Sequence, residues 1–146
     1  MAQAAPTSGG MPRSSRTPDV FSAQAHARSR VAIPVVTGLI YGYWAAANRR
    51  SGGPITGWNL LFGFLTALVF AVVLFAVLTW APRLRRELHA VVWTAFVGIA
   101  FGFLFSQSGD SILTSIAISL AVAAVAFILM FYRFYTHEDA AGNRIR

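Results

Sequence analysis

Few side chains in this sequence are of the types that carry out chemistry. The chain has 12 basic residues, all of them arginine, together with 5 acidic residues, 3 histidines and no cysteine. The lack of cysteine excludes disulfides, thiol chemistry and cysteine-bound metals. His26, His89 and His137 lie far apart and do not show the short spacings typical of metal ligands. The sequence therefore predicts no metal site and no cofactor.

The charged residues are also absent from four long stretches, which are 31–48, 51–82, 90–109 and 111–132. Proton-coupled transport and catalysis within a membrane generally use ionisable groups placed inside the spanning segments. No nucleophile–base pair, phosphate-binding loop or pair of carboxylates occurs elsewhere in the sequence. We therefore expect a protein that is not an enzyme and has no catalytic residue.

The same uncharged stretches predict the elements of the fold. A helix crosses the hydrocarbon core of a bilayer, about 30 Å thick, in about 20 residues. A soluble helical bundle would need a polar face on each helix, and none of these stretches has one. We predict an all-α, four-transmembrane-helix bundle with up-down-up-down topology and helices at about 31–47, 56–81, 88–105 and 111–135. Pro34 is expected in the first turn of the first helix, with a disordered cytoplasmic tail at 1–30 and a second cytoplasmic tail at 136–146.

The arginines set the expected orientation in the membrane. Ten of the twelve lie in the N-terminal tail, the second connection and the C-terminal region, and only Arg49 and Arg50 lie in the opposite turns. Arginine accumulates on the cytoplasmic side, so we predict a multi-pass protein of the cell membrane with both termini in the cytoplasm. This distribution accounts for the net charge of +7, and no nucleic-acid partner is expected. The arginines predicted to contact lipid headgroups are Arg83, Arg85, Arg86 and Arg133.

Small residues spaced four apart give each predicted helix one face for close packing. Hydrophobicity does not draw helices together in lipid, whereas small side chains allow their backbones to approach. The candidate packing residues are Gly38, Gly42, Gly63, Ala67, Gly98, Gly102, Ser115 and Ser119. We expect these faces to hold the bundle together, and the alternative is that one face is left over for a homo-oligomer or a partner subunit.

Two polar features near the helix ends complete the candidate set. Asp110 is the one acidic residue on the predicted outer side, and we expect it to pair with Arg49 or Arg50. Such a pair would join the two outer turns at a gain of about 0–1 kcal/mol, and a small polar mouth for a ligand is the alternative. His89 is expected to extend toward the membrane interface beside Glu87.

The two predicted hairpins resemble each other. Gly-Leu-Ile-Tyr-Gly at 38–42 matches Gly-Ile-Ala-Phe-Gly at 98–102, and a turn containing serine and glycine follows each. Both hairpins would enter and leave the membrane in the same order, which is the pattern of parallel repeats. Duplication and chance similarity both account for this match.

Over residues 31–138 the chain resembles small four-helix membrane proteins of GC-rich actinobacteria. The resemblance rests on the glycine-spaced first helix, the run SGGPITGWN at 51–59 and the run FYRFYTHE at 131–138. It implies the same four-helix membrane fold and carries over no activity, cofactor or site residue.

These features lead to one expected role and one alternative. We expect an integral membrane protein that acts as a packing or accessory subunit, whose partners are the lipid bilayer and either further copies of itself or an unidentified membrane protein. The alternative is a small pore or carrier for a neutral or lipophilic solute that is not proton-coupled through a buried carboxylate. Its expected lining is Thr37, Tyr41, Thr66, Thr94 and Ser115.

Overall fold

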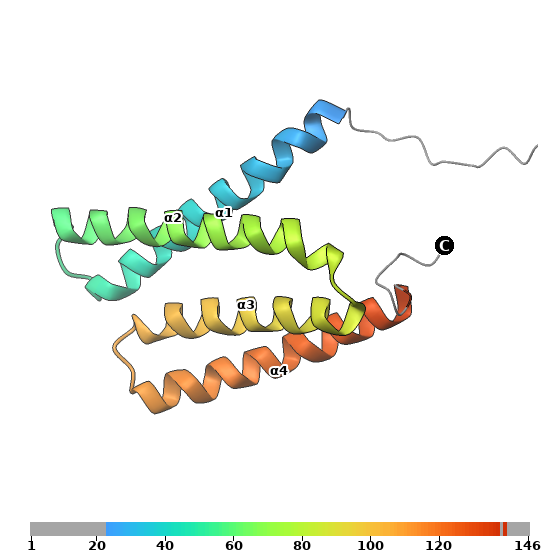
Figure 1. The fold of residues 1–146 in the computed structure, drawn as a ribbon. Coiled ribbons are helices and arrows are strands. Elements are labelled where there is room, and N and C mark those ends of the chain that lie inside the picture. The colour runs from blue at the N-terminus through green and yellow to red at the C-terminus, as the bar shows by residue number, and fades with distance from the viewer. Residues whose placement is uncertain (1–22, 138, 140–146) are drawn as a thin grey trace, which may run out of the picture.

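The computed structural model describes residues 23–137 and Asp139, and the other residues lie outside this description. The described part consists of helices and the turns between them (Figure 1). The elements are α1 (Ala23–Arg50), α2 (Gly57–Trp80), the short 3₁₀ helix η1 (Ala81–Arg83), α3 (Arg86–Ser106) and α4 (Ile112–His137). All four α-helices are long and apolar enough to cross a membrane. The chain thus has the features of a multi-pass integral membrane protein.

The first helix differs most from its prediction. It begins at Ala23 rather than near Val31, so residues 23–30 are helical and do not belong to a disordered tail. The absence of charge marks the hydrocarbon edge, but a helix can continue past that edge because Ala and Arg favour it. Pro34 therefore lies inside α1, and its predicted place in the first turn is wrong. Of the predicted tails at 1–30 and 136–146, residues 1–22, 138 and 140–146 lie outside the described residues, and Thr136 and His137 belong to α4.

The turns between the helices follow from local sequence. α2 is capped by Thr56, whose Oγ1 accepts a hydrogen bond of 3.2 Å from the backbone N–H of Asn59. The turn before it uses Gly52 at φ +83°, a left-handed conformation that glycine adopts without strain. Gly109, at φ +86°, has the same role between α3 and α4. These short connections make each consecutive pair of helices antiparallel (Figure 1).

The helices form two hairpins, α1–α2 and α3–α4, that meet along α3. α4 contacts α3 and no other described helix, so the arrangement is more open than the predicted four-transmembrane-helix bundle. α3 contacts both α1 and α2, but far less extensively than the helices within each hairpin contact each other (Figure 1). We call the end with the α1–α2 and α3–α4 turns the turn end, and the opposite end, with η1, the terminal end.

Aromatic rings and two hydrogen bonds connect the hairpins. The hydroxyl of Tyr41 donates a hydrogen bond of 2.5 Å to the carbonyl oxygen of Ala100. The side-chain amide of Asn48 donates one of 3.2 Å to the carbonyl oxygen of Leu104. The ring of Phe70 lies 4.2 Å from the ring centre of Tyr41 and 5.3 Å from that of Phe96 on α3. The second hairpin is therefore held by a few directional contacts rather than by a small-residue seam.

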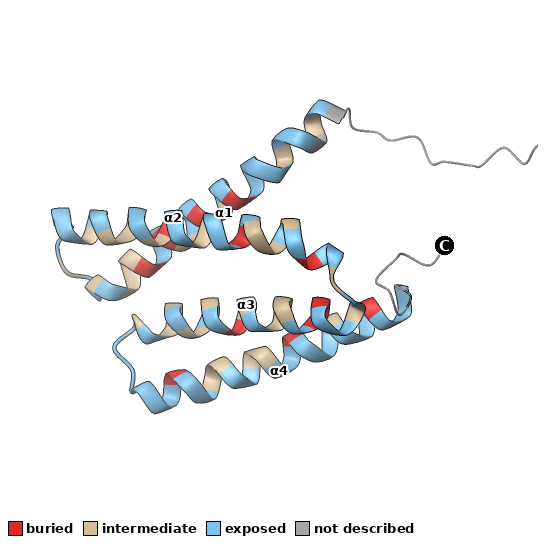
Figure 2. Cartoon of the chain, in the orientation of Figure 1, coloured by how far each residue is buried: buried red, intermediate tan, exposed pale blue. Residues whose placement is uncertain are grey.

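Burial is confined to the seams between helices (Figure 2). Most large apolar side chains on the helix surfaces are exposed, as expected where hydrocarbon takes the place of water. α4 is the least buried helix. Only 6% of its most apolar 18-residue segment is buried inside the described structure, whereas the corresponding share is 22% to 28% in the other three helices. A large part of its surface is therefore available to lipid or to another chain.

Candidate functional site

Within the first hairpin, glycine allows the backbones of α1 and α2 to touch. A Cβ placed on Gly38 would lie 2.6 Å from the carbonyl oxygen of Ala67 and 2.9 Å from the Cβ of Ala71. One placed on Gly42 would collide with the carbonyl oxygen of Gly63 and lie 2.7 Å from the Cβ of Ala67. Four of the predicted packing residues thus meet in one seam, which leaves no room for a larger side chain.

In the second hairpin the glycines also face small residues, but they approach side chains rather than backbone atoms. A Cβ on Gly98 would lie 2.8 Å from that of Ala123, and one on Gly102 would lie 2.6 Å from the hydroxyl of Ser119. That hydroxyl donates a hydrogen bond of 2.7 Å to the carbonyl oxygen of Gly98. Ser115 is buried nearby, but its hydroxyl donates at 3.1 Å to the carbonyl oxygen of Ser111, which immediately precedes α4.

The two seams correspond residue by residue. The contact of Gly38 with Ala71 in the first hairpin corresponds to that of Gly98 with Ala123 in the second. The contact of Gly42 with Ala67 likewise corresponds to that of Gly102 with Ser119. Each glycine pair has the same spacing, and so does each pair of small partners. The structure therefore extends the sequence match at 38–42 and 98–102 from the glycines to the helices they contact, which supports the interpretation of a repeat.

The charged residues at the turn end do not pair as expected. The guanidinium of Arg49 lies 4.3 Å from the ring centre of Phe62, and that of Arg50 donates to the carbonyl oxygen of Gly53 at 3.2 Å. Asp110 accepts a hydrogen bond of 3.1 Å from the hydroxyl of Ser108. Among the described residues there is no ion pair between Asp110 and either arginine, because both arginines turn back onto their own hairpin.

At the terminal end, α3 and α4 are joined by rings and cations. The guanidinium of Arg86 lies 4.2 Å from the ring centre of Tyr135 and 3.6 Å from the carboxylate of Glu87. The ring of His89 stacks on that of Phe134 at 3.9 Å and is only 7% exposed. The expectation that His89 reaches toward the interface is therefore wrong, since its buried ring packs against that of Phe134.

The other arginines predicted to face headgroups lie at the same end. Arg83 ends η1, Arg85 precedes α3, and Arg133 belongs to the last turns of α4. All three are exposed, in contrast to the partly covered Arg86. Within residues 23–137 and 139, no group of three potential metal-binding side chains comes together.

The hydroxyls expected to line a solute path are not gathered on one surface. Thr37 donates to the carbonyl oxygen of Ile33 in its own helix at 2.6 Å, and Ser115 donates to the carbonyl oxygen of Ser111 just before α4. The hydroxyl of Thr94 is buried without a hydrogen-bond partner in the described part of the chain. Only Tyr41 and Thr66 face a common cavity, which lies between the hairpins. This placement gives the pore or carrier alternative little support.

No family model, curated protein or solved structure matches the chain.

Proposed function

We propose that this protein is a non-catalytic packing or accessory subunit of an assembly in the cell membrane. The observation that carries the proposal is the isolation of α4, which among the described helices contacts α3 alone and is left mostly uncovered by residues 23–137. Its partner is a second copy of the chain or another membrane protein. This role requires no chemistry, in keeping with uncharged spanning segments.

The uncovered face of α4 is suited to another helix. Ser119 and Ala123 face α3, and a rotation of about 100° per residue places Ala117, Ala121 and Ala124 on the opposite side. All three alanines are exposed. Since small side chains allow close helix approach in lipid, this second small-residue face supports docking of a further helix.

The proposed orientation has both termini in the cytoplasm. The start of α1, the connection around η1 and the end of α4 lie at one end of the arrangement (Figure 1). Ten of the twelve arginines belong to these segments or to the sequence beyond them. The positive-inside rule then assigns the terminal end to the cytoplasm and the turn end to the outside.

Single-cysteine crosslinking tests the proposed interface, because the natural chain contains no cysteine. Ala121→Cys should crosslink in native membranes to a second copy or to one defined partner. Leu129→Cys lies on the same helix about 80° away and is 63% exposed, so it is the matched control. Efficient crosslinking is expected at position 121 and little at position 129.

Two results would count against the proposal. Equal crosslinking at both positions would mean random collision, and no crosslinked product at either position would mean that α4 faces lipid alone. Ala121→Leu provides an independent check, because a larger side chain should separate the helices and reduce co-purification of the partner.

A further inference from the structure

Two cavities meet on the surface of α2 near the turn end. The first, which we call the groove, has a volume of about 420 Å³ and lies between α2 and α3. The second, which we call the arginine pocket, has a volume of about 430 Å³ and includes Arg49, Arg50 and Asn59. Phe62 and Leu65 line both cavities, so the two form one continuous surface with a charged end and an apolar end.

The groove has the length and the lining of an acyl-chain site. On α2 it extends from Phe62 to Val73, which is about 17 Å at 1.5 Å per residue. One leaflet contributes about half of the 30 Å hydrocarbon core, so the groove matches the depth of a single leaflet. Val69 is 55% exposed and Ile99 is 72% exposed, which shows that the groove opens sideways toward the bilayer.

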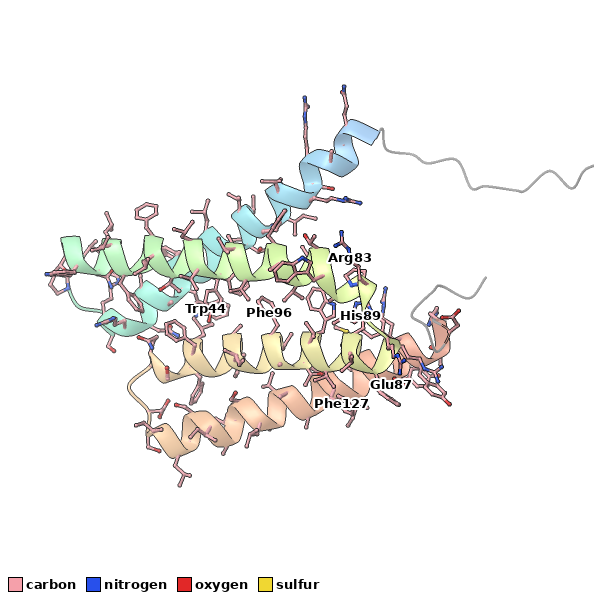
Figure 3. All side chains as sticks on the ribbon, viewed as in Figure 1. Trp44, Arg83, Glu87, His89, Phe96 and Phe127 are labelled. Carbon is pink, nitrogen blue, oxygen red and sulfur yellow. The ribbon has the colours of Figure 1, made fainter. Side chains whose placement is uncertain are left out.

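Aromatic rings from both hairpins shape this groove. Phe62 on α2 lies 6.2 Å from Phe103 on α3, and Phe70 lies 5.3 Å from Phe96, as measured between ring centres. Figure 3 shows Phe96 in the space between these two helices. Because α2 and α3 have few direct contacts, a bound chain would fill the gap that separates the hairpins.

The arginine pocket supplies the positive charge. The guanidinium of Arg49 is held over the ring of Phe62, at the point where the groove begins. Arg50 is oriented by its hydrogen bond to Gly53. Within the described residues no carboxylate lies within ion-pair distance of either arginine, so both charges are available to an anion. Arginine is well suited to phosphate because its planar group donates several hydrogen bonds.

We propose that the groove and the arginine pocket together bind one anionic phospholipid from the leaflet at the turn end. Arg49 and Arg50 hold its phosphate, and one acyl chain lies in the groove between α2 and α3. A lipid is the occupant because the cavities are continuous, charged at the headgroup level and apolar over the depth of one leaflet. This site lies away from the exposed alanine face of α4 and is independent of the subunit role.

Native mass spectrometry of the detergent-solubilised full chain tests this site with phosphatidylglycerol and phosphatidylcholine of identical acyl chains. The wild-type protein should retain phosphatidylglycerol preferentially. Arg49→Gln with Arg50→Gln should weaken retention about twenty-five-fold, since each arginine near an anionic headgroup contributes about fivefold. Arg28→Gln with Arg30→Gln removes the same charge from the start of α1, outside both cavities, and as the control for charge it should have little effect.

A second pair of variants tests the groove. Val69→Trp fills the groove and should reduce phosphatidylglycerol retention at least tenfold, whereas Leu68→Trp, on the neighbouring lipid-facing position outside the groove, should not. Circular dichroism confirms that each variant keeps its helices.

Several results would overturn the proposal. Equal retention of the two lipids would remove the role of the arginines, and unchanged retention in Val69→Trp would leave an anion site without an acyl chain. Loss of a protein dimer rather than of lipid in Val69→Trp would show that a second copy occupies the groove.

Discussion

The contact between Gly98 and Ala123 allows a sharp test of how the hairpins are packed. In Gly98→Ala the new Cβ would lie 2.8 Å from the Cβ of Ala123, while its next neighbours are at an ordinary 3.7 Å. Carbon atoms pack best at about 3.5–4.0 Å, so α3 and α4 must separate by roughly 1 Å. Overpacking of this kind costs about 1–3 kcal/mol.

The opposing change should remove this cost. Ala123→Gly deletes the one atom that collides, and on its own it costs about 1 kcal/mol in helix propensity. In the double variant Gly98→Ala should therefore no longer destabilise the protein. We expect a coupling energy of about 1–3 kcal/mol between the two positions, equal to the overpacking cost that is removed. The measurement is unfolding by sodium dodecyl sulfate in mixed micelles, monitored by circular dichroism.

The first hairpin provides a matched contrast. A Cβ on Gly42 collides with the backbone oxygen of Gly63 and lies 2.8 Å from the backbone nitrogen of Ala67. Gly42→Ala should therefore remain destabilising when combined with Ala67→Gly, because a substitution removes side-chain atoms and leaves the colliding backbone atoms in place. Equal destabilisation by Gly98→Ala with and without Ala123→Gly would refute the inferred packing, and so would full rescue of Gly42→Ala by Ala67→Gly.

Two further predictions concern single contacts. Tyr41→Phe removes the hydrogen bond to Ala100 and should lower the free energy of unfolding by about 0.6–1.5 kcal/mol in the same titration, whereas Tyr43→Phe, at an exposed position, should have no effect. His89→Ala removes a buried ring stacked on Phe134 and should lower the free energy of unfolding by about 1–3 kcal/mol. An unchanged midpoint of the unfolding titration would mean that this stack contributes nothing to stability.

The spanning segments could be predicted because hydrocarbon excludes charge, and this constraint is visible in sequence. The ends of α2, α3 and α4 accordingly lie within about two residues of their predicted positions. The start of α1 was missed because Arg28 and Arg30 are compatible with a helix outside the hydrocarbon. Charged residues in the sequence indicate where the hydrocarbon region begins, but they do not indicate where helical hydrogen bonding ends.

Pairing of the helices was harder to predict than their existence. Spacing identified the small-residue faces, but every helix has one, and nothing in the spacing specifies which faces meet. The contact from Tyr41 to Ala100 depends on a backbone carbonyl, which carries no sequence signature. The burial of His89 depends on Phe134, a residue on another helix whose distance only the fold determines. The continuity of the groove with the arginine pocket likewise arises from three helices together.

The two-hairpin arrangement has a consequence for how the protein is made. Each small-residue seam joins helices that are adjacent in the chain, so α1 and α2 hold all of their seam before α3 has been synthesised. Local contacts form early and rapidly, because little chain entropy is lost in closing a short loop. The first hairpin can therefore assemble as a unit during insertion, and only the sparse contacts along α3 must wait until the ribosome has completed the second.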